Sequence, residues 1–189
     1  MSHPIVSFTK RHAAGIAGDI DISLAPLRKQ SLKRVREWMG NAEIAFNLGV
    51  RSPVSEAAQA RWWREYKKDR GKEVYEIRYR GIHIGNVSID AISLRDGTAR
   101  LTIFIGEGSY RAKGIGERAL RLFLYYLFQY RRFRKIYLLV HAVNIPAIKV
   151  YRRVGFRKEG LLKRHEIIEG KELDKYFMSI FGACFLKGK

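Results

Sequence analysis

The segment Arg111-Ala-Lys113-Gly114-Ile-Gly116 combines cations and glycines directly before a helical pattern. It follows an apolar run that ends at Ile105, so the chain is expected to pass from a strand through a short loop into a helix. The first N–H groups of a helix have no intrahelical partner and lie at the positive end of the helix dipole. Glycines let an anion approach this backbone closely. The segment predicts a phosphate-binding loop, although a tight turn would use the same glycines.

Two other phosphate-binding motifs fit this sequence less well. No G-x-x-x-x-G-K-[ST] string, the loop of many nucleoside triphosphatases, occurs in the chain. Gly114, Gly116 and Ala119 satisfy the dinucleotide pattern G-x-G-x-x-A, but that motif needs an acidic residue about 20 positions further on. Residues 131–148 include neither Asp nor Glu. A dinucleotide site is therefore disfavoured.

A second motif lies downstream, Asn144-Ile-Pro-Ala147-Ile-Lys-Val-Tyr151-Arg-Arg-Val-Gly155-Phe156. It resembles the second signature of the GNAT superfamily of N-acetyltransferases. Arg111-x-x-Gly114-x-Gly116 resembles the loop with which those enzymes bind the pyrophosphate of acetyl-CoA. Both signatures occur in the expected order, separated by one predicted helix and one predicted strand. The resemblance spans about residues 19–181 and is strongest for the RimJ/RimL-like branch.

This resemblance implies that acetyl-CoA is the co-substrate, and it also implies which residues bind it. The strand before the loop would bind the pantetheine arm as an added strand, and the loop amides would bind the pyrophosphate. Asn144 would hydrogen-bond the pantetheine, although a helix N-cap is its other interpretation. The implied cofactor-binding residues are Ile103, Phe104, Ile105, Arg111, Ala112, Lys113, Gly114, Ile115, Gly116, Asn144, Lys149 and Arg152.

Tyr151 is the expected catalytic acid. Attack of a neutral amine on the thioester expels a thiolate, which a phenol aimed at the sulfur can protonate. A tyrosine packed in the core is the alternative interpretation. The general base is open among Glu107, Asp90, His165 and Glu166, with Glu107 the first choice because it follows the strand beside the expected thioester. His165 and Glu166 are neighbours on one strand, so at most one points inward.

In enzymes that this chain resembles, the acceptor is bound by the first two helices and by the hairpin of the last two strands. The acceptor-binding candidates on these elements are Trp38, Asn41, Glu43 and His165. Trp62 and Trp63 are adjacent on a predicted helix, so both cannot face the core and one could line a pocket.

Hydrophobic periodicity predicts the elements that must position these residues. Strands are expected at 19–27, 73–79, 82–94, 99–105, 136–140, 156–168 and 176–181, and helices at 31–39, 55–71, 114–130 and 146–154. With the resemblance, this order predicts an α/β fold class. We expect a single-domain GNAT-like mixed sheet, mostly antiparallel, of about seven strands flanked by about four helices.

Composition limits the remaining possibilities. The chain has 189 residues, the size of one domain, and we expect a leader at 1–18 before an acetyltransferase domain at 19–189. Cys184 is the only cysteine, which excludes an intramolecular disulfide framework and indicates a cytoplasmic protein. No long apolar run predicts a membrane span, and no H-E-x-x-H motif indicates a metal. A monomer or homodimer is expected.

The charge bears on the acceptor. With 37 Lys and Arg against 18 Asp and Glu, the net charge is +19. This charge disfavours a polycationic acceptor, and a protein N-terminus or a nucleotide-linked amino sugar suits it better. The alternative is a basic nucleic-acid- or ribosome-binding protein on a GNAT-like fold without transferase activity. Its candidate surface is the basic run Arg131-Arg-Phe-Arg-Lys135, which could contact phosphates. Such a run is also typical of a solvated helix end.

Overall fold

The computed structural model of the chain describes residues 21–50 and 53–187. The predicted leader at 1–18 lies outside the described residues, as do residues 19 and 20. In the described part, one sheet contains β1 (Ile22–Pro26), β2 (Glu73–Tyr79), β3 (Ile82–Ser93), β4 (Thr98–Ile105), β5 (Lys135–His141), β6 (Arg157–Ile168) and β7 (Lys171–Phe181). The α-helices are α1 (Leu32–Met39), α2 (Ala42–Leu48), α3 (Glu56–Tyr66), α4 (Ile115–Tyr125), α5 (Ile145–Val154) and α6 (Gly182–Lys187).

The strands follow the order β1-β2-β3-β4-β5-β7-β6 across the sheet. All neighbours are antiparallel except β4 and β5, which are parallel. The parallel pair is possible because α4 crosses over between these two strands. The predicted seven-stranded, mostly antiparallel α/β sheet is therefore confirmed.

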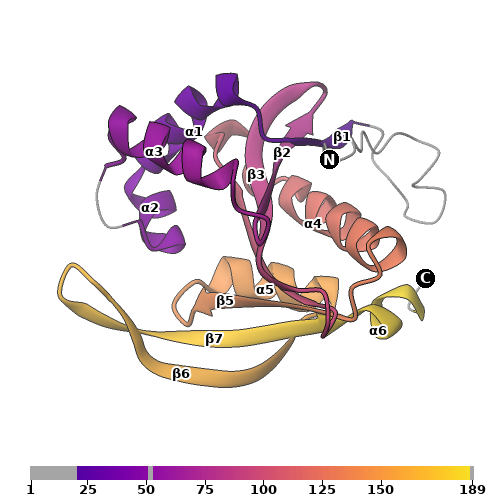
Figure 1. Cartoon of the computed structure of the whole chain (residues 1–189). Coiled ribbons are helices and arrows are strands. Elements are labelled where there is room, and N and C mark those ends of the chain that lie inside the picture. Colours follow the sequence, from indigo (N-terminus) through magenta and orange to yellow (C-terminus); the bar gives the residue numbers. More distant parts are fainter. Residues whose placement is uncertain (1–20, 51–52, 188–189) are drawn as a thin grey trace.

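Helices cover both faces of the sheet. Figure 1 shows α1, α2 and α3 together on one side of β2 and β3, and α4 on the other. The main core forms between the sheet, α4 and α5, with Phe123, Leu127 and Phe156 almost fully buried. Burying a side chain of this size contributes roughly 1.5–3 kcal/mol. On β3, Val87 and Ile89 face this core, so the alternate residues Asn86, Ser88 and Asp90 face the side of α1 to α3.

The described chain has two α-helices that the sequence pattern did not predict, α2 and α6. The expected stop at residues 40–41 separates α1 from α2 instead of opening a loop. The Asn41 side chain accepts a hydrogen bond from the N–H of Ile44 and caps α2, and Gly49, at φ +68°, ends it. A helix of seven residues between a cap and a glycine shows too few turns to reveal its period.

Candidate active site

The two strands in the middle of the sheet separate and leave a slot. β4 and β5 pair only as far as Arg100 and Tyr137. Beyond these residues β4 keeps β3 on its other edge, and β5 keeps β7. The facing edges therefore lack a strand partner, as binding of an extended arm by strand addition requires. The predicted pantetheine-binding residues Ile103, Phe104 and Ile105 lie on this open part of β4.

The loop after β4 has the expected order of strand, loop and helix. Gly114, at φ +72°, is the residue directly before α4, and Ala112 also has a positive φ of 57°. In the described part of the chain, the N–H groups of Ala112, Lys113 and Gly114 donate to no backbone carbonyl. Ile115 and Gly116 begin the helix, where N–H groups have no intrahelical acceptor. The loop therefore presents backbone donors at the positive end of α4, which suits a phosphate.

Arg111 turns away from this loop and holds the end of β4. Its Nε and Nη2 donate to the carbonyl oxygens of Ile105 and Gly106 at 3.0 and 3.1 Å, and its Nη1 donates to Glu43 Oε2 at 3.0 Å. These carbonyls lie where β4 has left β5, so the guanidinium supplies donors that a neighbouring strand would have provided. A contact between Arg111 and the pyrophosphate stays a prediction.

Asn144 joins α5 to α2. Its Oδ1 accepts from the N–H of Ala147 at 3.1 Å, which makes it the N-cap of α5, and its Nδ2 donates to Asn47 Oδ1 at 2.8 Å. The helix-cap interpretation is therefore confirmed, and the pantetheine contact stays a prediction. Lys149 and Arg152, the other predicted cofactor contacts on α5, are exposed.

Tyr151 lies on α5 and packs against the core. Its ring centroid is 5.7 Å from that of Phe156, and burial raises the pKa of its phenol to about 12. No hydrogen bond among the described residues involves its hydroxyl. A phenol with this pKa keeps its proton at neutral pH, so Tyr151 is suited to donate a proton and not to accept one.

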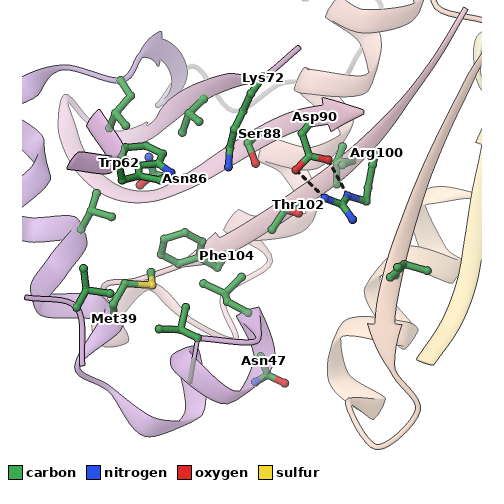
Figure 2. A pocket seen from close by; sticks show the side chains of 18 of the residues that line it. Met39, Asn47, Trp62, Lys72, Asn86, Ser88, Asp90, Arg100, Thr102 and Phe104 are labelled. Carbon is green, nitrogen blue, oxygen red and sulfur yellow. Dashed lines mark hydrogen bonds and ion pairs between the residues drawn. The ribbon is translucent and has the colours of Figure 1, made fainter. Parts of the chain in front are cut away.

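A cavity of about 660 Å³ lies between the sheet and the helices α1, α2 and α3 (Figure 2). Three cross-strand pairs of β3 and β4 line it: Asn86 with Phe104, Ser88 with Thr102, and Asp90 with Arg100. The helices contribute the mostly apolar side chains of Val35, Met39, Leu48, Ala58 and Trp62. Leu139 on β5 also lines the cavity, so the cavity reaches the slot between β4 and β5.

The two carboxylates of this cavity are both held by cations or imidazole. Asp90 accepts from Arg100 Nε and Nη2 at 2.6 and 3.1 Å. Glu166 Oε2 lies 2.6 Å from His141 Nε2 and 2.9 Å from Lys175 Nζ. Burial alone would raise the pKa of Glu166, but the hydrogen bonds from His141 and Lys175 outweigh burial and lower it. Glu166 is therefore ionised at neutral pH.

The four predicted acceptor-binding residues do not line this cavity. Trp38 is buried, and its indole fills the space beside Gly106, where a Cβ would lie 2.0 Å from the ring. Asn41 caps α2, Glu43 in its first turn is exposed, and His165 is exposed on β6. Asn41 and Glu43 lie outside the cavity because α2 uses Asn41 as its cap and directs Glu43 to solvent. His165 lies outside it because side chains alternate along β6, and Glu166 is the one that points inward.

The structure also separates the other candidates. Trp62 lines the cavity while Trp63 does not, as their adjacent positions predicted. Glu107, the first choice for the general base, is partly buried and does not line the cavity. Sequence reasoning missed Asn86 and His141. The alternation of polar residues with Val and Ile at 86–90 was a signal that one face of this central strand borders a polar site.

Three residues of the basic run are engaged within the fold, while Arg132 and Arg134 are exposed. Arg131 forms two hydrogen bonds with Glu73, at 2.8 and 2.9 Å, and Lys135 forms an ion pair with Glu159 at 2.7 Å. Phe133 is buried. The run therefore does not present a row of free cations and aromatic faces, and the nucleic-acid-binding alternative is not favoured.

The described residues include neither a cluster of metal ligands nor a membrane-spanning helix. No three His, Cys, Asp or Glu side chains in that part gather closely enough to hold a metal ion, and the expected absence of a metal stays a prediction. No helix there is long and apolar enough to cross a bilayer.

Comparison with known proteins gives one family. The family described as "Acetyltransferase (GNAT) domain" matches residues 21–157. The spermidine N(1)-acetyltransferase of Escherichia coli K12 is 27% identical over 87% of this chain and 88% of that relative.

Solved structures show the same fold. The crystal structure of spermidine N-acetyltransferase from Vibrio cholerae in complex with CoA and spermine has a TM-score of 0.82 at 22% identity, over 89% of this chain and 99% of that one. A dodecameric structure of the V. cholerae enzyme in an intermediate state has a TM-score of 0.79 at 21% identity, over 90% and 99% of the two chains. These relatives do not support the narrower resemblance to the RimJ/RimL-like branch.

Proposed function

Because this chain belongs to the GNAT acetyltransferases, which use acetyl-CoA as co-substrate, we propose that it acetylates a primary amine bound in the cavity of Figure 2. The observation that carries this proposal is the meeting of the cavity with the slot between β4 and β5, where Leu139 borders both. An amine in the cavity and a thioester in the slot would lie side by side, so direct attack in a ternary complex needs no covalent enzyme intermediate.

The proposed reaction requires three proton transfers. The acceptor enters as an ammonium ion and must lose a proton before it attacks. We propose that Glu166 receives this proton, directly or through water, because it lines the cavity and is ionised. The neutral nitrogen attacks the carbonyl carbon, the C–N bond forms and the C–S bond breaks. Tyr151 gives its phenol proton to the departing thiolate and regains one from the acetylated nitrogen. The products are the amide, free CoA thiol and one proton.

The charges of the cavity favour an acceptor that carries no positive charge besides the ammonium group to be acetylated. A polycation binds best where carboxylates are free to meet it, but Asp90 and Glu166 are already paired with Arg100 and Lys175. A protein N-terminus or a nucleotide-linked amino sugar remains our proposal for the acceptor. A polyamine is the second candidate, favoured by the names of the relatives in E. coli and V. cholerae.

An acceptor panel tests this proposal. Thiol release from acetyl-CoA would be measured with N-terminal peptides, nucleotide-linked amino sugars, aminoglycosides and spermidine, each with mass analysis of the product. We expect acetylation of an amine that carries no second ammonium group. Preference for spermidine over every other amine would overturn the acceptor assignment, and thiol release with no amine at all would overturn the proposed function.

A further inference from the structure

The cavity includes a buried amide with an unused donor. Asn86 is 5% exposed, and its Nδ2 has no hydrogen-bond partner among the described residues. Its Oδ1 lies 3.1 Å from His83 Nε2, which leaves the two N–H bonds of Nδ2 for another acceptor. A buried donor without an acceptor costs about 1–3 kcal/mol. A ligand oxygen that reached this donor would remove that cost.

The same cavity includes a cation without a carboxylate partner. Lys72 Nζ lies 5.6 Å from the ring centroid of Trp62, and both side chains line the cavity (Figure 2). No described carboxylate forms an ion pair with Lys72. Arg100 and Lys175, the other cavity cations, are both paired. Lys72 is therefore the charge in the described cavity that an incoming anion can neutralise.

Two hydroxyl groups lie near these donors. Ser88 and Thr102 are cross-strand partners on the cavity face of β3 and β4, and Ser88 also pairs with Val74, two residues after Lys72. Neither hydroxyl forms a hydrogen bond with another described residue. This wall of the cavity thus offers an amide, an ammonium and two hydroxyls, and its carboxylates are occupied. Such a wall suits a ligand that brings oxygen acceptors and negative charge.

We propose that the acceptor carries a carboxylate or phosphate at the end opposite to its amine, and that Lys72 and Asn86 Nδ2 bind this anion. The inference rests on the proposed function, because it assigns the far end of the same acceptor. Lys72 directly precedes β2, and β3 and β4 separate β2 from the slot. At about 4.8 Å between strands, the amine and the anion are of the order of 10 Å apart. A diamine of that length would bring a second ammonium group to Lys72, which is repulsive.

A matched series of acceptors tests the subsite. The ω-aminocarboxylates from aminobutyrate to aminooctanoate, the corresponding aminoalkyl phosphates and the diamines of equal length would be compared by kcat/KM. We expect kcat/KM for the anionic acceptors to exceed that for the length-matched diamines by about 10- to 100-fold, because a charge-assisted hydrogen bond contributes a free energy of that size. The carboxylate and phosphate arms identify which anion is bound. A diamine preferred at every length would overturn the inference.

Charge reversal at Lys72 is a second test of the proposed anion subsite. Lys72→Glu is expected to invert the order of anionic acceptors and diamines, and Lys72→Met, which keeps the aliphatic chain over Trp62, is expected to abolish the difference. Lys67→Glu is the matched control, because Lys67 Nζ lies 5.8 Å from the Trp63 centroid in the same way but outside the cavity. An unchanged order in Lys72→Glu would contradict the inference.

A binding measurement separates this inference from the proposed function. N-acetyl-aminohexanoate would be titrated calorimetrically into the protein saturated with CoA, and into Lys72→Glu and Asn86→Leu with melting temperatures as a check of folding. Binding that both variants weaken by about tenfold or more supports the subsite even if no acetyl transfer is seen. Equal binding by the wild type and both folded variants would overturn the subsite while leaving acetyl transfer intact.

Discussion

The loop before α4 and the cavity under α1 to α3 offer hydrogen bonds of different kinds. In the loop, the donors are backbone N–H groups of Ala112, Lys113 and Gly114, and the side chains are exposed. In the cavity, the donors belong to side chains such as Asn86 and Lys72. Backbone donors survive most substitutions that keep the loop's shape, whereas side-chain donors change with each substitution. We therefore expect acetyl-CoA binding to depend on the backbone conformation of the loop, which we call the cofactor side. Acceptor binding should depend on which residues line the cavity, which we call the acceptor side.

Removal of the Tyr151 hydroxyl should have the largest effect, because every turnover would need the proton that this phenol is proposed to donate. We expect Tyr151→Phe to lower kcat by about 10- to 1000-fold through loss of the proton donor. The dissociation constant of acetyl-CoA, measured by calorimetry, should stay within about twofold. An unaltered kcat would remove Tyr151 from the mechanism.

A change of backbone conformation in the loop should come next. Gly114 has φ +72°, where a β-branched residue is strained by roughly 1–3 kcal/mol. Gly114→Val is therefore expected to weaken acetyl-CoA binding by about 10- to 100-fold. Lys113→Ala, which keeps the backbone donors, should weaken it by only about threefold. If the lysine variant lost more affinity than the glycine variant, the loop would act through its side chains.

Substitution of the proposed base should act on the acceptor side alone. Glu166→Gln is expected to lower kcat/KM for the acceptor by about tenfold and to leave acetyl-CoA affinity unchanged. Glu107→Gln is the matched comparison, since Glu107 lies outside the cavity, and it should have little effect. Steady-state kinetics on both variants would decide, and the reverse result would return the role of base to Glu107.

The pH profile should show the smallest change. Tyr151 has a pKa raised to about 12, so its donating form is present below that pH. Glu166 has a lowered pKa, so it is ionised throughout the neutral and alkaline range. We expect no alkaline fall of kcat up to about pH 10. A fall centred near pH 9 that disappears in Tyr151→Phe would show that burial does not raise this pKa.

Local motifs made the cofactor side predictable. The order of strand, loop and helix around Gly114 and the cap at Asn144 depend on residues close together in the sequence, and the structure has both. The acceptor side depends on contacts distant in sequence, such as Asn47 with Asn144 and His141 with Glu166. No local pattern reports these contacts, and α2 was too short to predict. Trp38, Asn41 and Glu43 lie outside the cavity, and their contact with the acceptor stays a prediction.

Calorimetric titration of acetyl-CoA into the purified protein measures whether the slot and the loop before α4 bind this co-substrate. We expect binding of one acetyl-CoA per chain with a micromolar dissociation constant, and weaker binding by Gly114→Val. Absence of both heat and a thermal shift at millimolar acetyl-CoA would contradict this expectation.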